Sequence, residues 1–399
     1  MHKGAKWLTL TAGAAFILGM AGQAQAADLK GGGCCADLEE RVAELEATTA
    51  RKGNRVVSLE ISGQVNKALL IWDDGDESDA FIVDPDSDGS RFRFTGKAKL
   101  KPGWEAGYTM EFNVTDAQSN TVSQDNDESA FGDTPKIRRN FLYIEGERLG
   151  RFTIGQENQA TDGINEIDVV GTYSSVSKTH YAGGFFITGG DGLRWQDVLG
   201  AIGGGQEDII RYDTPTIAGF VASVSWGDDD IYDVALRFSK QFNSVKVAAG
   251  IGYLVDDRED SDVDTQLSGS VSAQHVPSGL FATFAAGQRD FDDDREEATN
   301  WYVKGGISRK WLPYGDTTLW ADYAHFNGFG DGFELDSSTE ENPFTVSSSE
   351  ANVWGFGVVQ AFDSAALNVY ALTQFYSADI NDLETEDHFA VVIGSHIKF

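Results

Sequence analysis

A row of basic side chains occupies alternate positions in one short segment. Arg91, Arg93, Lys97 and Lys99 share one parity, whereas apolar residues such as Phe92 fill positions between them. Successive residues of a β-strand point to opposite faces, so these cations would lie on a single face. A row of guanidinium and ammonium groups can attract anions and steer ions by its field. The pattern predicts a strand with one charged, water-facing side.

Other residue combinations that could do chemistry are weaker. The segment Asp84–Gly89 begins like a calcium-binding loop, with oxygen ligands at positions 1, 3 and 5 and glycine at position 6. Thr95 stands at position 12, where such loops need a bidentate glutamate, so we expect a solvated loop and no metal site. The histidines have no metal-binding spacing such as H-E-x-x-H, and no G-x-S-x-G sequence is present. We therefore expect neither an enzyme nor a cofactor.

The charged row belongs to one of sixteen segments in which apolar residues recur with period 2. These segments are 57–71, 91–101, 104–114, 137–146, 151–157, 208–214, 219–227, 231–239, 245–254, 265–274, 280–288, 299–308, 317–326, 351–360, 366–376 and 388–399. Short connections alternate with long acidic ones, which is typical of transmembrane barrels. The pattern predicts a sixteen-stranded antiparallel β-barrel over residues 56–399, with a soluble β-sandwich or propeller as the alternative.

The last segment carries its apolar residues, among them Phe389, Val391, Ile393 and Phe399, on one parity. We expect this strand to close the sheet, and an apolar outer face on a closed sheet needs lipid. The formal net charge of −32 argues against nucleic acid as a partner. Its acidic runs lie between the strands and predict solvated loops, which could also bridge to lipopolysaccharide through divalent cations.

The N-terminal residues precede the barrel and differ from it in period. Residues 1–26 have the lysines, apolar run and small residues of a cleaved signal peptide. In residues 27–55, Leu38, Val42 and Leu45 form a short heptad stripe, which predicts a coiled coil that needs partners, and three chains would suit it. A lone amphipathic linker is the alternative. Two adjacent cysteines, at 34 and 35, favour disulfides between subunits or none.

One connection, residues 158–207, is much longer than the others and rich in glycine. The sequences on either side are distinctive: Arg138-Arg139-Asn140-Phe141, Gly150-Arg151-Phe152-Thr153-Ile154-Gly155-Gln156 and Ile210-Arg211-Tyr212-Asp213-Thr214-Pro215. They resemble the sequences around the inward-folded third loop of the trimeric, sixteen-stranded general porins of Gram-negative outer membranes. The N-terminal segment is similar to that of an alphaproteobacterial branch of that family. The resemblance implies that residues 158–207 fold into the barrel and narrow a pore.

In that family, carboxylates on the third loop face a ladder of arginines on the barrel wall. Matched by motif, Arg91, Arg138 and Arg211 occupy the arginine positions, and parity places Arg93 beside Arg91. Arg211 lies between two residues that would face lipid, where an arginine would cost about 2–4 kcal/mol, so it should face the lumen. A structural role, in which each arginine pairs with a neighbouring wall carboxylate, is the alternative.

The orientations of Arg138 and Arg139, and the choice of loop acids, follow less directly from the sequence. With Phe141 and Tyr143 pointing outward, Arg138 turns inward and Arg139 is left outward near the rim. The candidates for the acids that would face the arginines are Asp162, Glu166 and Asp168, with Asp191 and Asp197 further along the loop.

The resemblance implies a homotrimeric outer-membrane porin for passive diffusion of small hydrophilic solutes and ions. A substrate-selective channel, for example for sugars, is an alternative for which Tyr302 and Trp320 are the candidate inward aromatics. A second alternative is a tether in which the coiled coil binds the cell wall and the barrel is an anchor. Deleting residues 34–52 would separate them, because a channel would keep its conductance.

Overall fold

The computed structural model describes residues 56–127, 135–187, 192–259, 261–335, 344–381 and 383–399. The predicted signal peptide, both cysteines and the heptad residues Leu38, Val42 and Leu45 lie outside these residues. Within them, no helix is long and apolar enough to cross a membrane.

Strands make up most of the described chain. Their bounds are β1 Glu60–Asp73, β2 Ser78–Val83, β3 Arg91–Lys101, β4 Trp104–Asn113, β5 Lys136–Gly146, β6 Gly150–Asn158, β7 Gln206–Asp213, β8 Phe220–Gly227, β9 Ile231–Phe242, β10 Val245–Asp256, β11 Val263–His275, β12 Leu280–Phe291, β13 Ala298–Leu312, β14 Gly315–Asn327, β15 Glu334–Leu335, β16 Phe344–Thr345, β17 Ser349–Phe362, β18 Leu367–Ile380 and β19 His388–Lys398. The helical turns are η1 Asp86–Asp88, η2 Ile164–Glu166, η3 Lys178–Tyr181, α2 Trp195–Val198, η4 Asp228–Asp230 and η5 Asp363–Ala365.

The main sheet is a closed antiparallel barrel, as predicted. Sixteen places around its wall are occupied by strands, and we call these wall positions. It contains seventeen strands because β2 and β3 are two pieces of one wall position. The first half of β1 pairs with β3, and its second half pairs with β2. Residues between these pieces leave the wall, so the sequence pattern of period 2 is interrupted there. The short strands β15 and β16 form a separate hairpin within a long connection.

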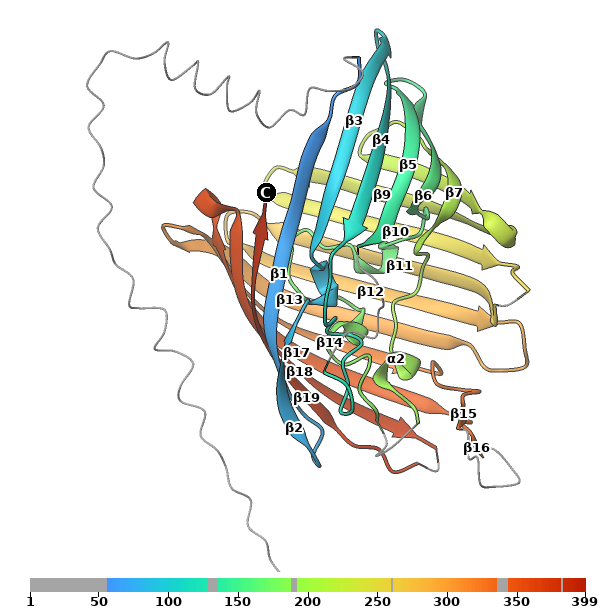
Figure 1. Ribbon diagram of the computed structural model, residues 1–399, viewed down its shortest axis with the longest axis vertical. Coiled ribbons are helices and arrows are strands. Elements are labelled where there is room, and N and C mark those ends of the chain that lie inside the picture. Colours follow the sequence, from blue (N-terminus) through green and yellow to red (C-terminus); the bar gives the residue numbers. More distant parts are fainter. Residues whose placement is uncertain (1–55, 128–134, 188–191, 260, 336–343, 382) are drawn as a thin grey trace, which may run out of the picture. The chain divides into compact units, whose positions relative to one another are not determined.

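The barrel closes where the first strand meets the last (Figure 1). β1 pairs with β19 from Gln64 opposite Lys398 to Asp73 opposite Phe389. Beyond that ladder, the Gly63 and Phe399 backbones exchange two hydrogen bonds of 2.9 and 3.0 Å. Pairing between neighbouring strands satisfies backbone polar groups that lipid could not satisfy.

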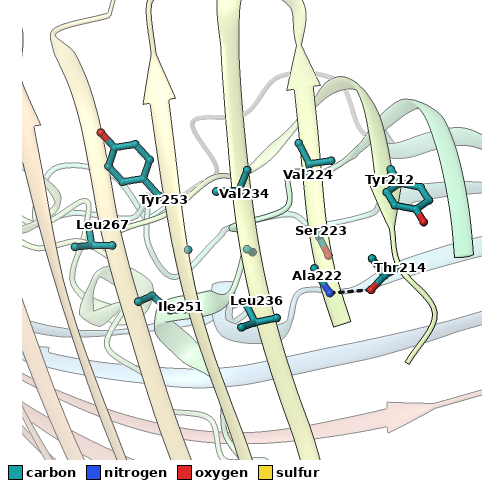
Figure 2. A pocket seen from close by; sticks show the side chains of 12 residues that line it. Tyr212, Thr214, Ala222, Ser223, Val224, Val234, Leu236, Ile251, Tyr253 and Leu267 are labelled. Atoms are coloured by element: carbon teal, nitrogen blue, oxygen red, sulfur yellow. Dashed lines mark hydrogen bonds between the residues drawn. The ribbon is translucent and has the colours of Figure 1, made fainter. Parts of the chain in front are cut away.

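The wall alternates between an apolar outer face and a more polar inner face. Along β9, for example, Val234 and Leu236 are exposed, whereas Asp233 and Ala235 are buried. Figure 2 shows apolar side chains of β8, β9, β10 and β11 side by side on the outer face, where they line a hollow of about 510 Å³. This alternation is the expected one for strands with lipid on one side and a lumen on the other.

The connection from β6 to β7 folds into the barrel, where α2 is visible inside the ring of strands (Figure 1). Its large apolar side chains Tyr181, Phe185 and Trp195 are fully buried. They pack in one cluster with inward residues of β1, β13, β14 and β17–β19, for example Trp72. The rings of Trp72 and Phe185 lie 5.0 Å apart between centroids. One side of the lumen is therefore filled by this connection, which we call the inner loop.

The closing seam generates a stability prediction. A Cβ on Gly63 would lie 2.6 Å from the Phe399 ring and 2.7 Å from the Arg91 carbonyl oxygen. Such overpacking typically costs about 1–3 kcal/mol, so Gly63→Ala should lower the temperature at which the folded barrel unfolds. Gly305→Ala is the matched control, because Gly305 is also in a strand and the atom nearest to its added Cβ would be 3.9 Å away. Heating-dependent mobility on gels measures both variants, and equal unfolding temperatures would contradict the prediction.

Candidate functional site

The side of the lumen that the inner loop leaves open is lined by arginines from β3, β5, β6, β7 and β9. They are Arg91, Arg93, Arg138, Arg139, Arg151, Arg211 and Arg237. On β7, the neighbouring Ile210 and Tyr212 are exposed on the outer face, so Arg211 points inward as its parity predicts. Arg91 and Arg93 likewise lie on the inner face of β3, where they bond to a buried acid of β4.

The orientation predicted for β5 is wrong. Phe141 is only 6% exposed and Leu142 is 61% exposed, so Leu142 rather than Phe141 faces outward. Arg139 has the parity of Phe141 and points inward, where it pairs with Glu157 at 2.9 Å. Arg138 also turns inward, because a bulge makes it an extra residue.

The bulge is visible in the register between β4 and β5. Glu111 pairs with Arg139, and the next residue, Phe112, pairs with Ile137, so Arg138 has no partner of its own. Period 2 breaks at such a position, which is why parity could not place both arginines.

A buried carboxylate on the wall holds three of these arginines. Glu111 is fully buried and forms ion pairs with Arg93, with Arg138 at 2.6 Å and with Arg91 at 3.6 Å. Arg91 also pairs with Asp88. The sequence analysis did not single out Glu111. Its place between the apolar Met110 and Phe112 marks it as inward, but the sequence could not show which arginines it meets.

The start of the inner loop is fixed by two further charged residues of β9 that sequence reasoning missed. The Asp233 carboxylate accepts hydrogen bonds from the Thr161 backbone and hydroxyl, both 2.6 Å long. Arg237 donates to the carbonyl oxygens of Ala160 and Asp162 at 2.7 and 2.6 Å. Arg211 holds the preceding residues in the same way, through the carbonyl oxygens of Asn158 and Gln159. The loop therefore leaves the wall in one defined direction.

The three candidate acids of the loop lie in different surroundings. Burial, reinforced by the nearby Glu166 charge, raises the pKa of the Asp162 carboxyl to about 6, against the opposing effect of Arg138, Arg139 and Arg237. Glu166 accepts a hydrogen bond from the Ser175 hydroxyl. Asp168 instead turns to the wall, where it pairs with Lys304 of β13 at 2.6 Å.

The far part of the loop is held by ionic and aromatic contacts. Lys178 is fully buried and pairs with the buried Asp322 of β14. Trp320 and Tyr302 do point inward, but they are only 5% and 2% exposed. Tyr302 lies under Lys178 and Lys304, with both ammonium groups within 6 Å of its ring centroid. Neither aromatic offers a free face to a solute.

Residues 84–90, which separate β2 from β3, also contact the inner loop. Asp86 bonds to His180 at 2.8 Å, and the Ser87 hydroxyl bonds to the Tyr181 hydroxyl at 2.7 Å. Asp84 is fully buried and pairs with Lys67 at 2.6 Å. The carboxylates of the calcium-like segment thus bond to protein groups. The residues described here contain no group of three or more side chains suited to hold a metal ion.

Comparison with known proteins gives one family. The sequence profile described as Gram-negative porin matches residues 9–381. No curated protein sequence matches the chain.

Solved structures with the same fold have low sequence identity. OmpT, an outer membrane protein of Vibrio cholerae solved in a trimer form, is 13% identical, with a TM-score of 0.55 over 86% of this chain and 100% of that chain. The anion-selective porin from Comamonas acidovorans is 14% identical, with a TM-score of 0.55 over 86% and 100%. OmpF of Salmonella typhi is 12% identical, with a TM-score of 0.52 over 86% and 98%. The chain belongs to the family of Gram-negative porins, outer-membrane barrels that form pores for passive diffusion.

Proposed function

We propose that solutes cross this porin between the arginine wall and the inner loop, with no catalytic step. The constriction residues would be Arg91, Arg93, Arg138 and Arg211 on the wall and Asp162 and Glu166 on the loop. The observation that carries the proposal is the loop start, which Asp233 and Arg237 bind beside the arginines. Asp168 is not part of the proposed constriction, because its carboxylate forms an ion pair with Lys304.

Separated charges of this kind act on a solute through a transverse field. A small polar solute can align its dipole with the field, whereas an apolar one would have to displace oriented water. The proposed solutes are therefore small hydrophilic molecules and ions. A sugar-selective channel is less well supported, because Tyr302 and Trp320 are covered by the loop. The tether alternative depends on residues 34–52, and deleting them while measuring conductance and envelope attachment separates it from the pore.

Conductance in planar bilayers tests the pore and its loop acid together. We expect large current steps and, across a salt gradient, a cation preference that falls between pH 7.5 and pH 5. The reason is the Asp162 carboxyl, which is charged above its pKa of about 6 and neutral below it. It lies in the loop, outside the strands that span the membrane.

At every pH, Asp162→Asn should show the weaker cation preference that wild type shows at low pH. Its cation preference should therefore not change near pH 6. Asp316→Asn removes a carboxylate at the start of β14, outside the proposed constriction, and is the control. Absence of any current would overturn the pore. If the cation preference of Asp162→Asn still changed near pH 6 as it does in wild type, only the role of Asp162 would be overturned.

We further propose that three copies associate through the outer face of β1 and β19. Lys67 and Ser395 are paired in register, and both are exposed on this otherwise apolar face. A lysine that faces lipid near the bilayer midplane costs about 2–4 kcal/mol, and a neighbouring subunit would remove that contact. The Lys67 ammonium already pairs with Asp84, and its side chain is still 47% exposed. Outer-membrane lipid and lipopolysaccharide would surround the rest of the barrel.

Charge reversal at this face tests the association. Lys67→Glu would place a carboxylate with no cationic partner at the proposed contact between subunits, so the trimer should dissociate. Arg309→Glu makes the same charge change on β13, at another exposed position, and should leave the trimer intact. Light scattering in detergent gives the mass of each variant. A wild-type monomer, or a Lys67→Glu trimer as stable as wild type, would contradict the proposed interface.

A further inference from the structure

A pocket of about 310 Å³ lies on the inner wall, formed by β3 to β7. Its charged lining residues are Arg93, Arg139, Arg151, Arg211, Glu157 and Asp213, and its other lining residues are Thr95, Thr109, Phe141 and Thr153. It lies apart from the hydrophobic cluster under the inner loop, whose members line none of it. The pocket therefore lies outside the packed side of the lumen.

Three of the four arginines pair with wall acids. Arg93 pairs with Glu111, Arg139 with Glu157 at 2.9 Å, and Arg211 with Asp213 at 2.8 Å. Asp213 also accepts a hydrogen bond from the Ser223 hydroxyl at 2.6 Å. These pairs offset part of the positive charge of the pocket and hold the three guanidinium groups against the wall.

Arg151 is different from the other three. Its Nε is buried without a hydrogen-bond partner, and within the described residues its guanidinium forms no ion pair. Glu145 and Asp213 lie opposite it in register on the neighbouring strands, yet neither is bonded to it. The guanidinium stacks on Tyr143, with its central carbon 3.9 Å from the ring centroid. Stacking of this kind holds the planar group in one orientation.

Threonine hydroxyls surround the same space. Thr109 is paired in register with Thr95 on one side and with Phe141 on the other, and Thr153 is paired with Arg211. None of the three hydroxyls has a hydrogen-bond partner among the residues that the structure describes. A hydroxyl can donate one hydrogen bond, so the pocket combines one oriented guanidinium with several uncommitted donors.

We propose that this pocket is a binding site for small oxyanions, carboxylates or phosphate, held by the Arg151 guanidinium and the threonine hydroxyls. A guanidinium presents parallel N–H donors that match two oxygens of such a group, whereas chloride offers a single atom to both donors. The proposal rests on the pore proposed above and adds a solute class to it. Oxyanions would pause at this site, so their flux should saturate with concentration while chloride flux does not.

Binding and conduction test the proposal separately. Isothermal titration of the folded full-length protein in detergent, at low ionic strength, uses sodium phosphate in one arm and sodium acetate in the other. Wild type should bind at least one of them, and the tighter one identifies the source of the oxyanion. Arg151→Gln should weaken that binding about tenfold, because a charge-assisted donor pair is lost.

Lys246→Gln is the matched control, because Lys246 lies on β10 outside the pocket and the change removes the same charge. It should bind as wild type does. Equal weakening in both variants would show general charge attraction and overturn the site, as would no binding of either anion to wild type.

In bilayers, added phosphate or acetate should reduce the chloride current of wild type but not of Arg151→Gln. A normal chloride current without this block would overturn the oxyanion site and leave the pore standing. Absence of any current together with anion binding in solution would overturn the pore and leave the site.

Discussion

The structure depends on one constraint, which is that every backbone polar group of the wall must find its partner within the barrel. The seam between β1 and β19 meets it by running the ladder to Phe399 itself. The gap between β2 and β3 is the place where the wall departs from the ladder. There the freed groups are satisfied from inside, for example by the hydrogen bonds between Asp84 and residues 116, 117 and 119. Residues 84–90, which interrupt the wall, thus also support the inner loop through their contacts with it.

That support divides the lumen into two unlike sides. On the side of β13–β19 and β1, the loop buries aromatic rings and the Lys178–Asp322 pair, so this side is packed like a protein core. On the side of β3–β9, charged groups remain next to open space. The inner loop is bound on both sides of the lumen. Asp233 and Arg237 bind its start, and Asp86 binds His180 further along. Contacts at these two places favour a fixed loop over a mobile one.

The period of two was enough to predict the sixteen wall positions and the inward direction of Arg91 and Arg211, because both depend only on alternation along one strand. It failed at β5, where aromatic residues were assigned to lipid and a bulge shifted the parity of Arg138. It also could not find Glu111 or Asp233 as partners, because ion pairs between strands depend on register. The β2 strand was missed because it occupies a segment whose acidic composition is typical of a loop. The inward loop followed from family resemblance rather than from periodicity.

The pairing of wall arginines with wall acids changes what the arginine row can do. Glu111 and Glu157 offset part of the charge that the sequence places on this face, so the number of arginines overstates its positive potential. Such pairs hold the arginine side chains in place on the inner face of the wall. In the function proposed above, the net selectivity would depend on the few groups that lack a strong partner. Asp162 on the loop and Arg151 on the wall are two such groups of opposite sign.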